Sequence, residues 1–350
     1  MKLHIFNTEH DLALAFGGAR FTAPHAARQL RADLGFLPAL MADDNDMVLV
    51  DDVDNAVNQM RYLRGELPQV QFVTPNHLPE YSDRIELICP WGWDIAICHE
   101  LRKACPSLTP MIADVETLAD IRQISNRRWS ANNLGNTGIY CSSLTEVNEQ
   151  CQTFRQFVLK APWSCSGRGV RYRRDDRWTE NVIRKQGGIM VEPYYNKVMD
   201  FAMEFSSDGC GHVSYLGISL FETVNGAYKG NLLAPEVEKM KILSKYIPQP
   251  EIIAVRQRII TRMTDYAGYS YRGPFGVDMM IYEHEGEIKL AECVELNLRT
   301  TMGHVALALT KRLNLDGTLP HQLMRVEYDG SHYHLRVLNT YNNALNTTQI

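Results

Sequence analysis

The first third of the chain alternates short apolar runs with helical patterns, and this alternation constrains the fold more than any other feature of the sequence. Strands that alternate with helices are typical of a parallel α/β sheet, because each parallel strand needs a crossover before the next one. The sequence therefore predicts a Rossmann-like parallel sheet near the N-terminus. Its expected strands are Leu3–Asn7, Met47–Val50 and Ile85–Cys89.

Ligands bind such sheets in the loops at the carboxyl ends of the strands. The segment Asn7–Asp11 follows the first expected strand, and Trp91–Asp94 follows the third. Both are candidates for substrate binding, with helix capping or packing as the alternative role. We also expect Thr22 to be the N-cap of a helix that starts near Pro24.

Pro106 and Pro110 interrupt this alternation of strands and helices, and a different pattern of secondary structure follows them. The later part reads as an α+β region rich in antiparallel hairpins, with a long amphipathic helix that carries Ile252 and Ile259. Its expected strands are Phe157–Lys160, Ile189–Glu192, Phe201–Phe205, Val213–Ser219, Phe275–Tyr282 and Ile288–Leu296. We place an N-terminal α/β domain at 1–115 and a second domain at 116–350, with lobes at about 120–205 and 206–340.

Composition excludes several classes of protein. The 350 residues carry a net charge of −5, so there is no global basic field for nucleic acid or an anionic membrane. No apolar run approaches the roughly 18 residues of a membrane span, and no secretory signal is evident, so we expect a cytoplasmic protein. None of the eight cysteines has C-x-x-C spacing, which leaves a zinc site unsupported and favours buried thiols.

Lys160 ends an expected strand and is followed by a loop of serine and glycine. Neither the P-loop nor the G-x-G-x-x-G fingerprint is present. The backbone N–H groups around Ser166, Gly167 and Gly169 could nevertheless surround a phosphate, with Lys160 and Arg168 supplying charge. The alternative is a simple hairpin turn.

Asp278, Glu295 and Asn297 form the strongest chemical signal. Glu295 and Asn297 are two apart on one strand and so share a face, and Asp278 can join them from a neighbouring strand. Two carboxylates and an amide oxygen suit Mg²⁺ that shares its other positions with phosphate oxygens. The alternative is a pair of solvated strand faces, but apolar residues flank all three: Val277, Met279, Val294, Leu296 and Leu298.

Together these residues resemble the ATP-grasp superfamily over roughly residues 120–316. The shared order is a lysine strand, a glycine-containing loop, a Glu-Pro-Tyr hinge, an acid, a Val-Asp strand, and Glu-x-Asn with a downstream Arg and Gly. The resemblance implies an N-terminal Rossmann-like domain followed by a two-lobed ATP-grasp domain. It implies phosphate contacts by Arg127 and Lys160, adenine contacts by Glu192 and Tyr194, a ribose contact by Asp200, and magnesium ligands in Asp278, Glu295 and Asn297. It further implies Lys229 near the γ-phosphate, Arg299 facing the transferred phosphate or acyl group, and a helix N-terminus at Gly303 that receives an anion.

The activity implied by the resemblance is an ATP-dependent ligase with one or two Mg²⁺ ions, for which Mn²⁺ could substitute. It would activate a carboxylate as an acyl phosphate for attack by an amine or another nucleophile such as a thiol. The substrates would be small molecules or peptides, and the chain would form a homodimer. The alternatives are a kinase-like phosphotransferase on the same scaffold and a non-catalytic nucleotide-binding protein. For Arg299, the alternative is a structural ion pair with an acid such as Glu292.

Overall fold

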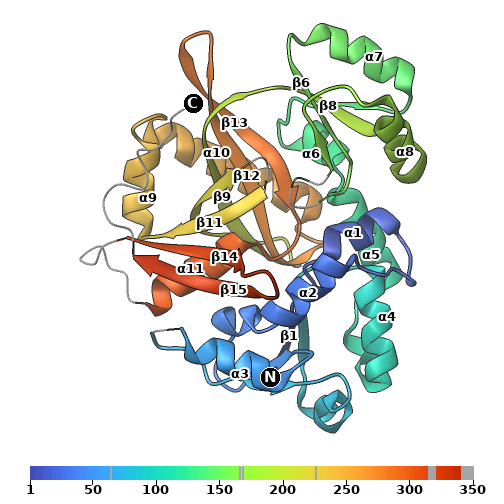
Figure 1. Cartoon of the computed structure of the whole chain (residues 1–350), viewed down its shortest axis with the longest axis vertical. Coiled ribbons are helices and arrows are strands. Elements are labelled where there is room, and N and C mark those ends of the chain that lie inside the picture. The colour runs from blue at the N-terminus through green and yellow to red at the C-terminus, as the bar shows by residue number, and fades with distance from the viewer. Residues whose placement is uncertain (64, 165–166, 168, 225–226, 314–320, 340–350) are drawn as a thin grey trace.

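The structure is a computed structural model that describes residues 1–63, 65–164, 167, 169–224, 227–313 and 321–339. Its described strands form three sheets (Figure 1). The predicted combination of a parallel sheet and large antiparallel sheets is confirmed. Within the described residues, no helix is long and apolar enough to span a bilayer.

The N-terminal sheet is parallel, with the strand order β3-β2-β1-β4. Its strands are β1 (Lys2–Ile5), β2 (Met47–Leu49), β3 (Gln71–Val73) and β4 (Leu87–Pro90). The helices of this part are α1 (His10–Phe16), α2 (His25–Leu34), α3 (Val53–Arg61), α4 (Ile95–Ala104) and α5 (Val115–Ile124), with short 3₁₀ helices at Leu37–Met41, Leu78–Arg84 and Pro106–Met111.

The prediction of Thr22 as an N-cap is wrong, because Pro24 is the N-cap of α2. The extended backbone that proline imposes on the residue before it keeps the preceding segment out of the helix.

A small antiparallel sheet with the order β5-β8-β6-β7 forms the green lobe at the upper right of Figure 1. Its elements are α6 (Arg127–Asn133), β5 (Ile139–Cys141), α7 (Leu144–Thr153), β6 (Phe157–Lys160), β7 (Val170–Arg171), α8 (Asp176–Gln186) and β8 (Ile189–Pro193).

The largest sheet has seven strands in the order β13-β12-β9-β10-β11-β14-β15. Its strands are β9 (Asn196–Asp208), β10 (Val213–Val224), β11 (Ala227–Leu233), β12 (Arg272–His284), β13 (Glu287–Asn297), β14 (Gln322–Tyr328) and β15 (Tyr333–Asn339). The accompanying helices are α9 (Glu236–Leu243), α10 (Gln249–Ala267) and α11 (Met302–Arg312).

The change from the small to the large sheet lies between β8 and β9, earlier than the predicted lobe boundary near residue 205. The first residues of β9 lack the apolar pattern that starts at Phe201, and they are extended because they pair with β12. The other predicted domain limits stay predictions.

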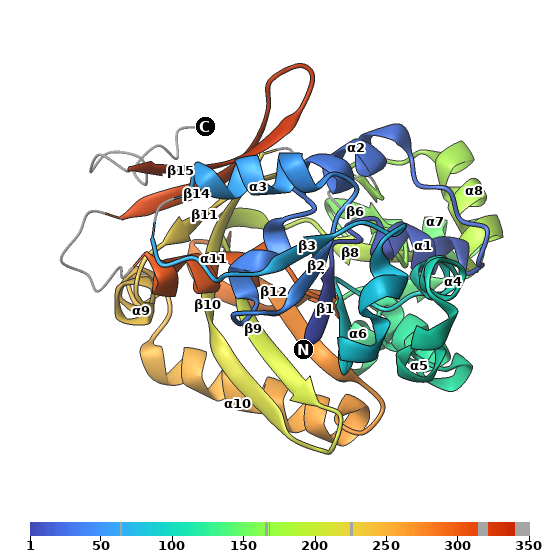
Figure 2. The same cartoon turned by 90° about the horizontal axis from the view of Figure 1, so that it is seen from below.

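The two faces of the large sheet differ in chemistry. Phe201, Met203 and Val277 lie on the apolar face and pack in one core with residues of α10, such as Val255. The helix α10 lies beneath the sheet in Figure 2. The opposite face carries the polar side chains of β9, β12 and β13. This alternation follows from the two-residue period of strands.

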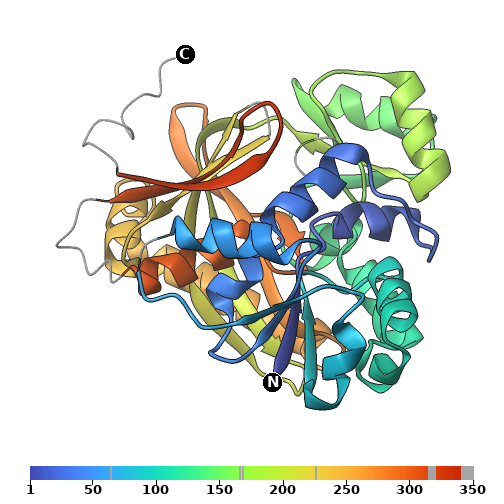
Figure 3. The ribbon, with the colours of Figure 1, turned by 60° about the horizontal axis from the view of Figure 1, so that its bottom comes forward.

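The N-terminal and C-terminal parts share a core. Leu34 and Leu40 pack in one apolar cluster with Val305, Leu309 and Leu335. Figure 3 shows the blue helices α1 and α2 between the parallel sheet and the green lobe, and α1 contacts α8. This packing brings the carboxyl end of the parallel sheet toward the polar face of the large sheet.

Candidate active site

Asp278, Glu295 and Asn297 lie on the polar face of the large sheet. Asp278 on β12 is directly opposite Glu295 on β13, and Asn297 is opposite Gly276. Directly paired residues of antiparallel strands share a face. Burial and the facing Glu295 carboxylate together raise the pKa of Asp278 to about 7, although a hydrogen bond with the Asn297 side chain acts in the opposite direction.

This donor set fits a magnesium ion. Two carboxylates that face each other repel, and a divalent cation between them removes the cause of the raised pKa. In the described part of the chain, no three His, Cys, Asp or Glu side chains gather closely enough to hold a metal ion. An ion held by Asp278, Glu295 and the Asn297 amide oxygen would therefore need further oxygen ligands from a substrate, as phosphate provides.

Arg127 connects the small lobe to this site. It starts α6, is buried, and its guanidinium donates to the Ala161 carbonyl, to Ser164 Oγ at 2.9 Å and to Glu295 Oε1. Its Nε–H has no partner among the described residues. A buried guanidinium with a free donor beside a carboxylate pair can bind an anion as well as stabilise the lobe contact.

Lys160 and Glu192, which the sequence assigned to phosphate and adenine, contact each other. Lys160 ends β6, Glu192 lies on the adjacent β8, and Lys160 Nζ is 2.5 Å from Glu192 Oε2. The other carboxylate oxygen of Glu192 is buried and has no partner among the residues that the structure describes. The pair thus keeps one free acceptor, which suits an amino group such as that of adenine.

The loop after Lys160 is a hairpin, because β6 and β7 pair antiparallel. Gly167 has φ +71°, and a Cβ on Gly169 would lie 2.2 Å from the Cβ of Ser164, so both positions favour glycine. Ser166 lies outside the described residues. The hairpin is thus observed, and phosphate binding by this loop stays a prediction.

The remaining nucleotide candidates lie just after β8, on β9 and on β11. Tyr194 is 47% exposed, with its ring edge against Tyr172. Asp200 lies on β9 and accepts hydrogen bonds from Lys197 at 2.7 Å and from Thr223 at 2.6 Å. Lys229 is exposed on β11 and forms no ion pair with any described residue. Their roles at adenine, ribose and γ-phosphate stay predictions.

The start of α11 is occupied by a carboxyl group of the protein itself. Thr301 is the N-cap, and its hydroxyl donates to Glu204 Oε2 at 2.9 Å. A Cβ on Gly303 would lie 1.9 Å from Glu204 Oε1, so the glycine makes room for this carboxyl group. Burial, with nearby Asp278, raises the pKa of Glu204 to about 8, which favours its neutral form at pH 7. Binding of a substrate anion at this helix stays a prediction.

Arg299 is paired across the molecule. Its Nε and Nη2 donate to Asp11 Oδ2 at 3.0 and 2.8 Å, and Nη2 also donates to Asn297 Oδ1 at 2.9 Å. The alternative prediction that Arg299 pairs with Glu292 is wrong, because Glu292 pairs with Arg258 at 2.6 Å. Burial raises the pKa of Asp11, but the Arg299 guanidinium outweighs it and the net pKa is below the ordinary value.

Asp11 is the site residue that sequence reasoning did not connect to Arg299. Asp11 follows β1. Thr300, the residue after Arg299, donates its N–H to the carbonyl of Trp91 at 2.7 Å, and Trp91 lies in the loop after β4. The segment Arg299–Thr300 thus joins the metal-ligand candidates to both loops at the carboxyl end of the parallel sheet. The only sequence feature that pointed to Asp11 was its position after a strand of the parallel sheet, where ligands usually bind.

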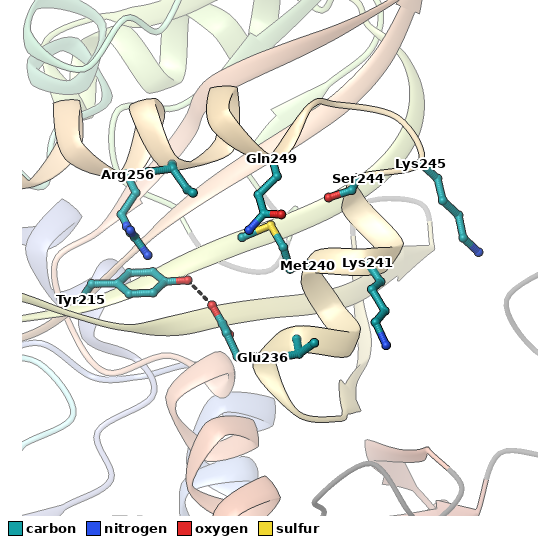
Figure 4. A pocket seen from close by; sticks show the side chains of 10 residues that line it. Tyr215, Glu236, Met240, Lys241, Ser244, Lys245, Gln249 and Arg256 are labelled. Atoms are coloured by element: carbon teal, nitrogen blue, oxygen red, sulfur yellow. Dashed lines mark hydrogen bonds between the residues drawn. The ribbon is translucent and has the colours of Figure 1, made fainter.

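A hollow of about 630 Å³ lies on the other face of the large sheet, between α9 and α10 (Figure 4). Three of its polar residues contact one another: Tyr215 donates to Glu236, and the Arg256 guanidinium lies 4.7 Å from the centre of the Tyr215 ring. The candidate site is separate from it.

The combination of a parallel sheet, a small antiparallel lobe and a large antiparallel sheet matches solved structures with the ATP-grasp fold. No protein-family model and no curated protein sequence matches the chain. Solved structures do match over nearly all of it. N5-carboxyaminoimidazole synthetase from Staphylococcus aureus, complexed with ADP, has a TM-score of 0.53 at 12% identity and covers 94% of this chain and 83% of its own.

Two further matches have the same fold. Biotin carboxylase from Campylobacter jejuni, complexed with a β,γ-ATP ligand, has a TM-score of 0.52 at 10% identity, over 93% of this chain and 75% of its own. An Archaeoglobus fulgidus protein assigned to the ATP-grasp superfamily has a TM-score of 0.50 at 13% identity, over 97% of this chain and all of its own. At these identities the likeness establishes the fold.

Proposed function

We propose that this protein is a Mg-ATP-dependent ligase, which activates a carboxylate as an acyl phosphate for attack by a nucleophile. The observation that carries the proposal is the pair Asp278 and Glu295, held face to face with Asn297 on the polar face of an ATP-grasp sheet. Arg127 compensates the charge of Glu295, but Asp278 has no ion pair with any described residue, and a buried carboxylate in that position is costly without a further cation. Similar structures include an ADP complex and a β,γ-ATP complex.

Each group has a distinct role in the proposal. Asp278, Glu295 and Asn297 would hold one or two Mg²⁺ ions, which neutralise charge on the phosphoryl oxygens when bound. Lys160 donates to phosphate oxygens, and Arg127 uses its free Nε–H near Glu295 for the same anion. No protein nucleophile is required.

Further residues complete the assignment. Glu192 Oε1 accepts from the adenine amino group, Tyr194 covers the base and Asp200 accepts from the ribose hydroxyls. Lys229 extends from β11 toward the γ-phosphate. Arg299 keeps its charge beside Asn297 and stabilises the acyl phosphate or the oxyanion that forms upon attack.

The test is product analysis with hydroxylamine present. We incubate the protein with Mg-ATP, a panel of carboxylic acids and hydroxylamine, which converts an acyl phosphate into a hydroxamate. A ligase forms ADP, phosphate and hydroxamate in equal amounts, and Asp278→Asn forms none. ADP without phosphate, together with a stable phosphorylated acceptor, indicates the kinase-like alternative. Nucleotide binding without turnover across the panel contradicts the proposal.

The homodimer is also part of the proposal. Size-exclusion chromatography with light scattering tests it: a mass near twice 39.9 kDa supports a dimer, and a mass near 39.9 kDa contradicts it.

A further inference from the structure

The hollow between α9 and α10 has no part in the proposed reaction, and its size suits a small molecule. Its volume of about 630 Å³ lies within the range of small-molecule sites. Two helix surfaces form its walls, and their residues recur at helical spacing, which places them on one side of each helix. They are Val237, Met240, Lys241 and Ser244 along α9 and at its end, and Gln249, Ile253 and Arg256 on α10.

Both walls carry exposed apolar side chains. Val237 is 64% exposed and Ile253 is 39% exposed, and Met240 lines the hollow with them. On the inner sides of the same helices, Leu243 and Ile252 are buried in the core beneath the sheet. Each helix is therefore held by the sheet, and the apolar side chains between the helices are available to the apolar body of a ligand.

The carboxylate of Glu236 is already used within the protein. It is the only carboxylate among the described residues that line the hollow. Tyr215 O–H donates to one of its oxygens, and Ile218 N–H donates to the other at 2.9 Å. Ile218 follows an irregularity in the pairing of β10 with β9, so this contact fixes the strand. Glu236 thus has a structural role and leaves the cations of the hollow unpaired.

Arg256 is the cation best placed to bind an anion. Arg256 and Lys245 form no ion pair with any described residue, whereas Lys241 pairs with Glu238 at 2.7 Å. The Arg256 side chain extends from α10 toward Tyr215 (Figure 4), and its guanidinium lies 4.7 Å from the centre of the ring. A guanidinium over a ring keeps its N–H edge for a carboxylate, which it can bind with two parallel hydrogen bonds.

We propose that this hollow binds an amphipathic small-molecule carboxylate, whose carboxylate pairs with Arg256 and whose apolar chain covers Val237 and Ile253. Ser244 and Gln249, whose side chains have no hydrogen-bond partner within the described part of the chain, offer further donors. An anion without an apolar body would leave the exposed apolar side chains uncovered. The inference goes beyond the proposed function and does not rest on it, because the hollow and the candidate active site lie on opposite faces of the large sheet.

The test is calorimetry on the full chain without nucleotide. The probes are the even-numbered straight-chain acids from acetate to decanoate, each below the concentration at which it forms micelles. Affinity should rise about 3- to 4-fold per added methylene until the hollow is filled. Octanoate should bind at least about 10-fold more tightly than octanol or octylammonium, because only the acid makes a charge-assisted contact with Arg256.

Two variants separate the polar from the apolar contact. Arg256→Gln should weaken octanoate binding about 10-fold or more, and Ile253→Ser should weaken decanoate binding more than hexanoate binding. The matched controls are Arg262→Gln, at an exposed arginine of the same helix outside the hollow, and Val115→Ser, at a valine that is 80% exposed elsewhere. Both controls should leave binding within about 2-fold.

A measurement on the wild type covers the case in which Arg256→Gln does not fold. In protein labelled at its methionine methyl groups, octanoate should shift the resonance of Met240, which Met240→Leu assigns. An unshifted Met240 resonance at saturating octanoate would contradict the inference.

Several other outcomes overturn it. These are no binding by any acid of the series, equal binding of octanoate and octylammonium, binding of inorganic phosphate as tight as that of octanoate, or equal losses in Arg256→Gln and Arg262→Gln. Saturating Mg-ADP should leave octanoate binding unchanged, and displacement by Mg-ADP would place the acid at the candidate active site instead. Failure of the hydroxamate assay would not affect these results, so the two proposals are tested separately.

Discussion

Replacing Asp278 with asparagine should stabilise the metal-free protein at alkaline pH while it abolishes the response to magnesium. Asp278 has a pKa of about 7 in the folded chain, against 3.8 for an ordinary aspartate. The folded state therefore binds the proton more tightly than the unfolded chain. Stability from this group is fully present below about pH 4 and is lost as pH rises toward 7.

The magnitude follows from the pKa difference. Three units correspond to about 4 kcal/mol, and relaxation around a partly buried pair reduces this to about 2–4 kcal/mol. The asparagine side chain cannot ionise, so at pH 8 without metal the variant should unfold at a Tm at least about 3 °C above the wild type. Glu204, whose pKa is also raised, to about 8, contributes a slope of the same sign in both proteins, so the comparison isolates Asp278.

The assay is thermal unfolding from pH 5 to 8.5, with and without millimolar Mg²⁺ and ADP. Mg²⁺ with ADP should raise the Tm of the wild type most at high pH and leave Asp278→Asn nearly unchanged. Asp265→Asn, at an exposed aspartate on α10, serves as the control and should behave as the wild type. A variant less stable than the wild type at pH 8, or one with an intact magnesium response, would refute the assigned role of this carboxylate.

Three further predictions follow from the same geometry. Lys160→Ala should raise the Kd for ATP about 10- to 100-fold by calorimetry, whereas the exposed Lys245→Ala should not change it. Arg299→Lys should lower hydroxamate formation about 100-fold with less than about 3-fold change in ATP binding, because lysine loses the two-pronged geometry; equal losses in both would return this residue to a structural role. Gly303→Ala should cost about 2 kcal/mol or more in urea unfolding, since its Cβ would overlap Glu204.

Local patterns predicted the parts of the fold that are buried on a regular period. The parallel sheet could be predicted because its apolar runs are short and continuous. The pairing of Asp278 with Glu295 could be predicted because apolar neighbours indicate that both strands are part of the core. The expected strands do not include β3, β5, β7, β11, β14 and β15. Strands such as β3 have only three residues, too few for a periodic pattern, whereas the β14–β15 hairpin carries alternating apolar residues such as Met324 and Val326.

The pairing of Arg299 with Asp11 could not be predicted in the same way. The two residues are 288 positions apart, and their contact depends on how the N-terminal part docks against the large sheet. Local spacing placed Arg299 beside Asn297 and placed Asp11 after a parallel strand. Which acid meets the guanidinium is decided by the shared core of α2, α11 and β15, a property of the whole chain.

The docking of the N-terminal part against the large sheet brings the candidate metal ligands into contact with the segments after β1 and β4. Thr300 N–H binds the Trp91 carbonyl, and Arg299 binds Asp11, so two adjacent residues fix both loops of the parallel sheet to the end of β13. Asn297, a candidate metal ligand, shares its side-chain oxygen with the same guanidinium. These contacts connect both segments to the candidate metal ligands through one guanidinium and one peptide group. Under the proposed function, substrate binding at those segments would therefore be coupled to the metal site.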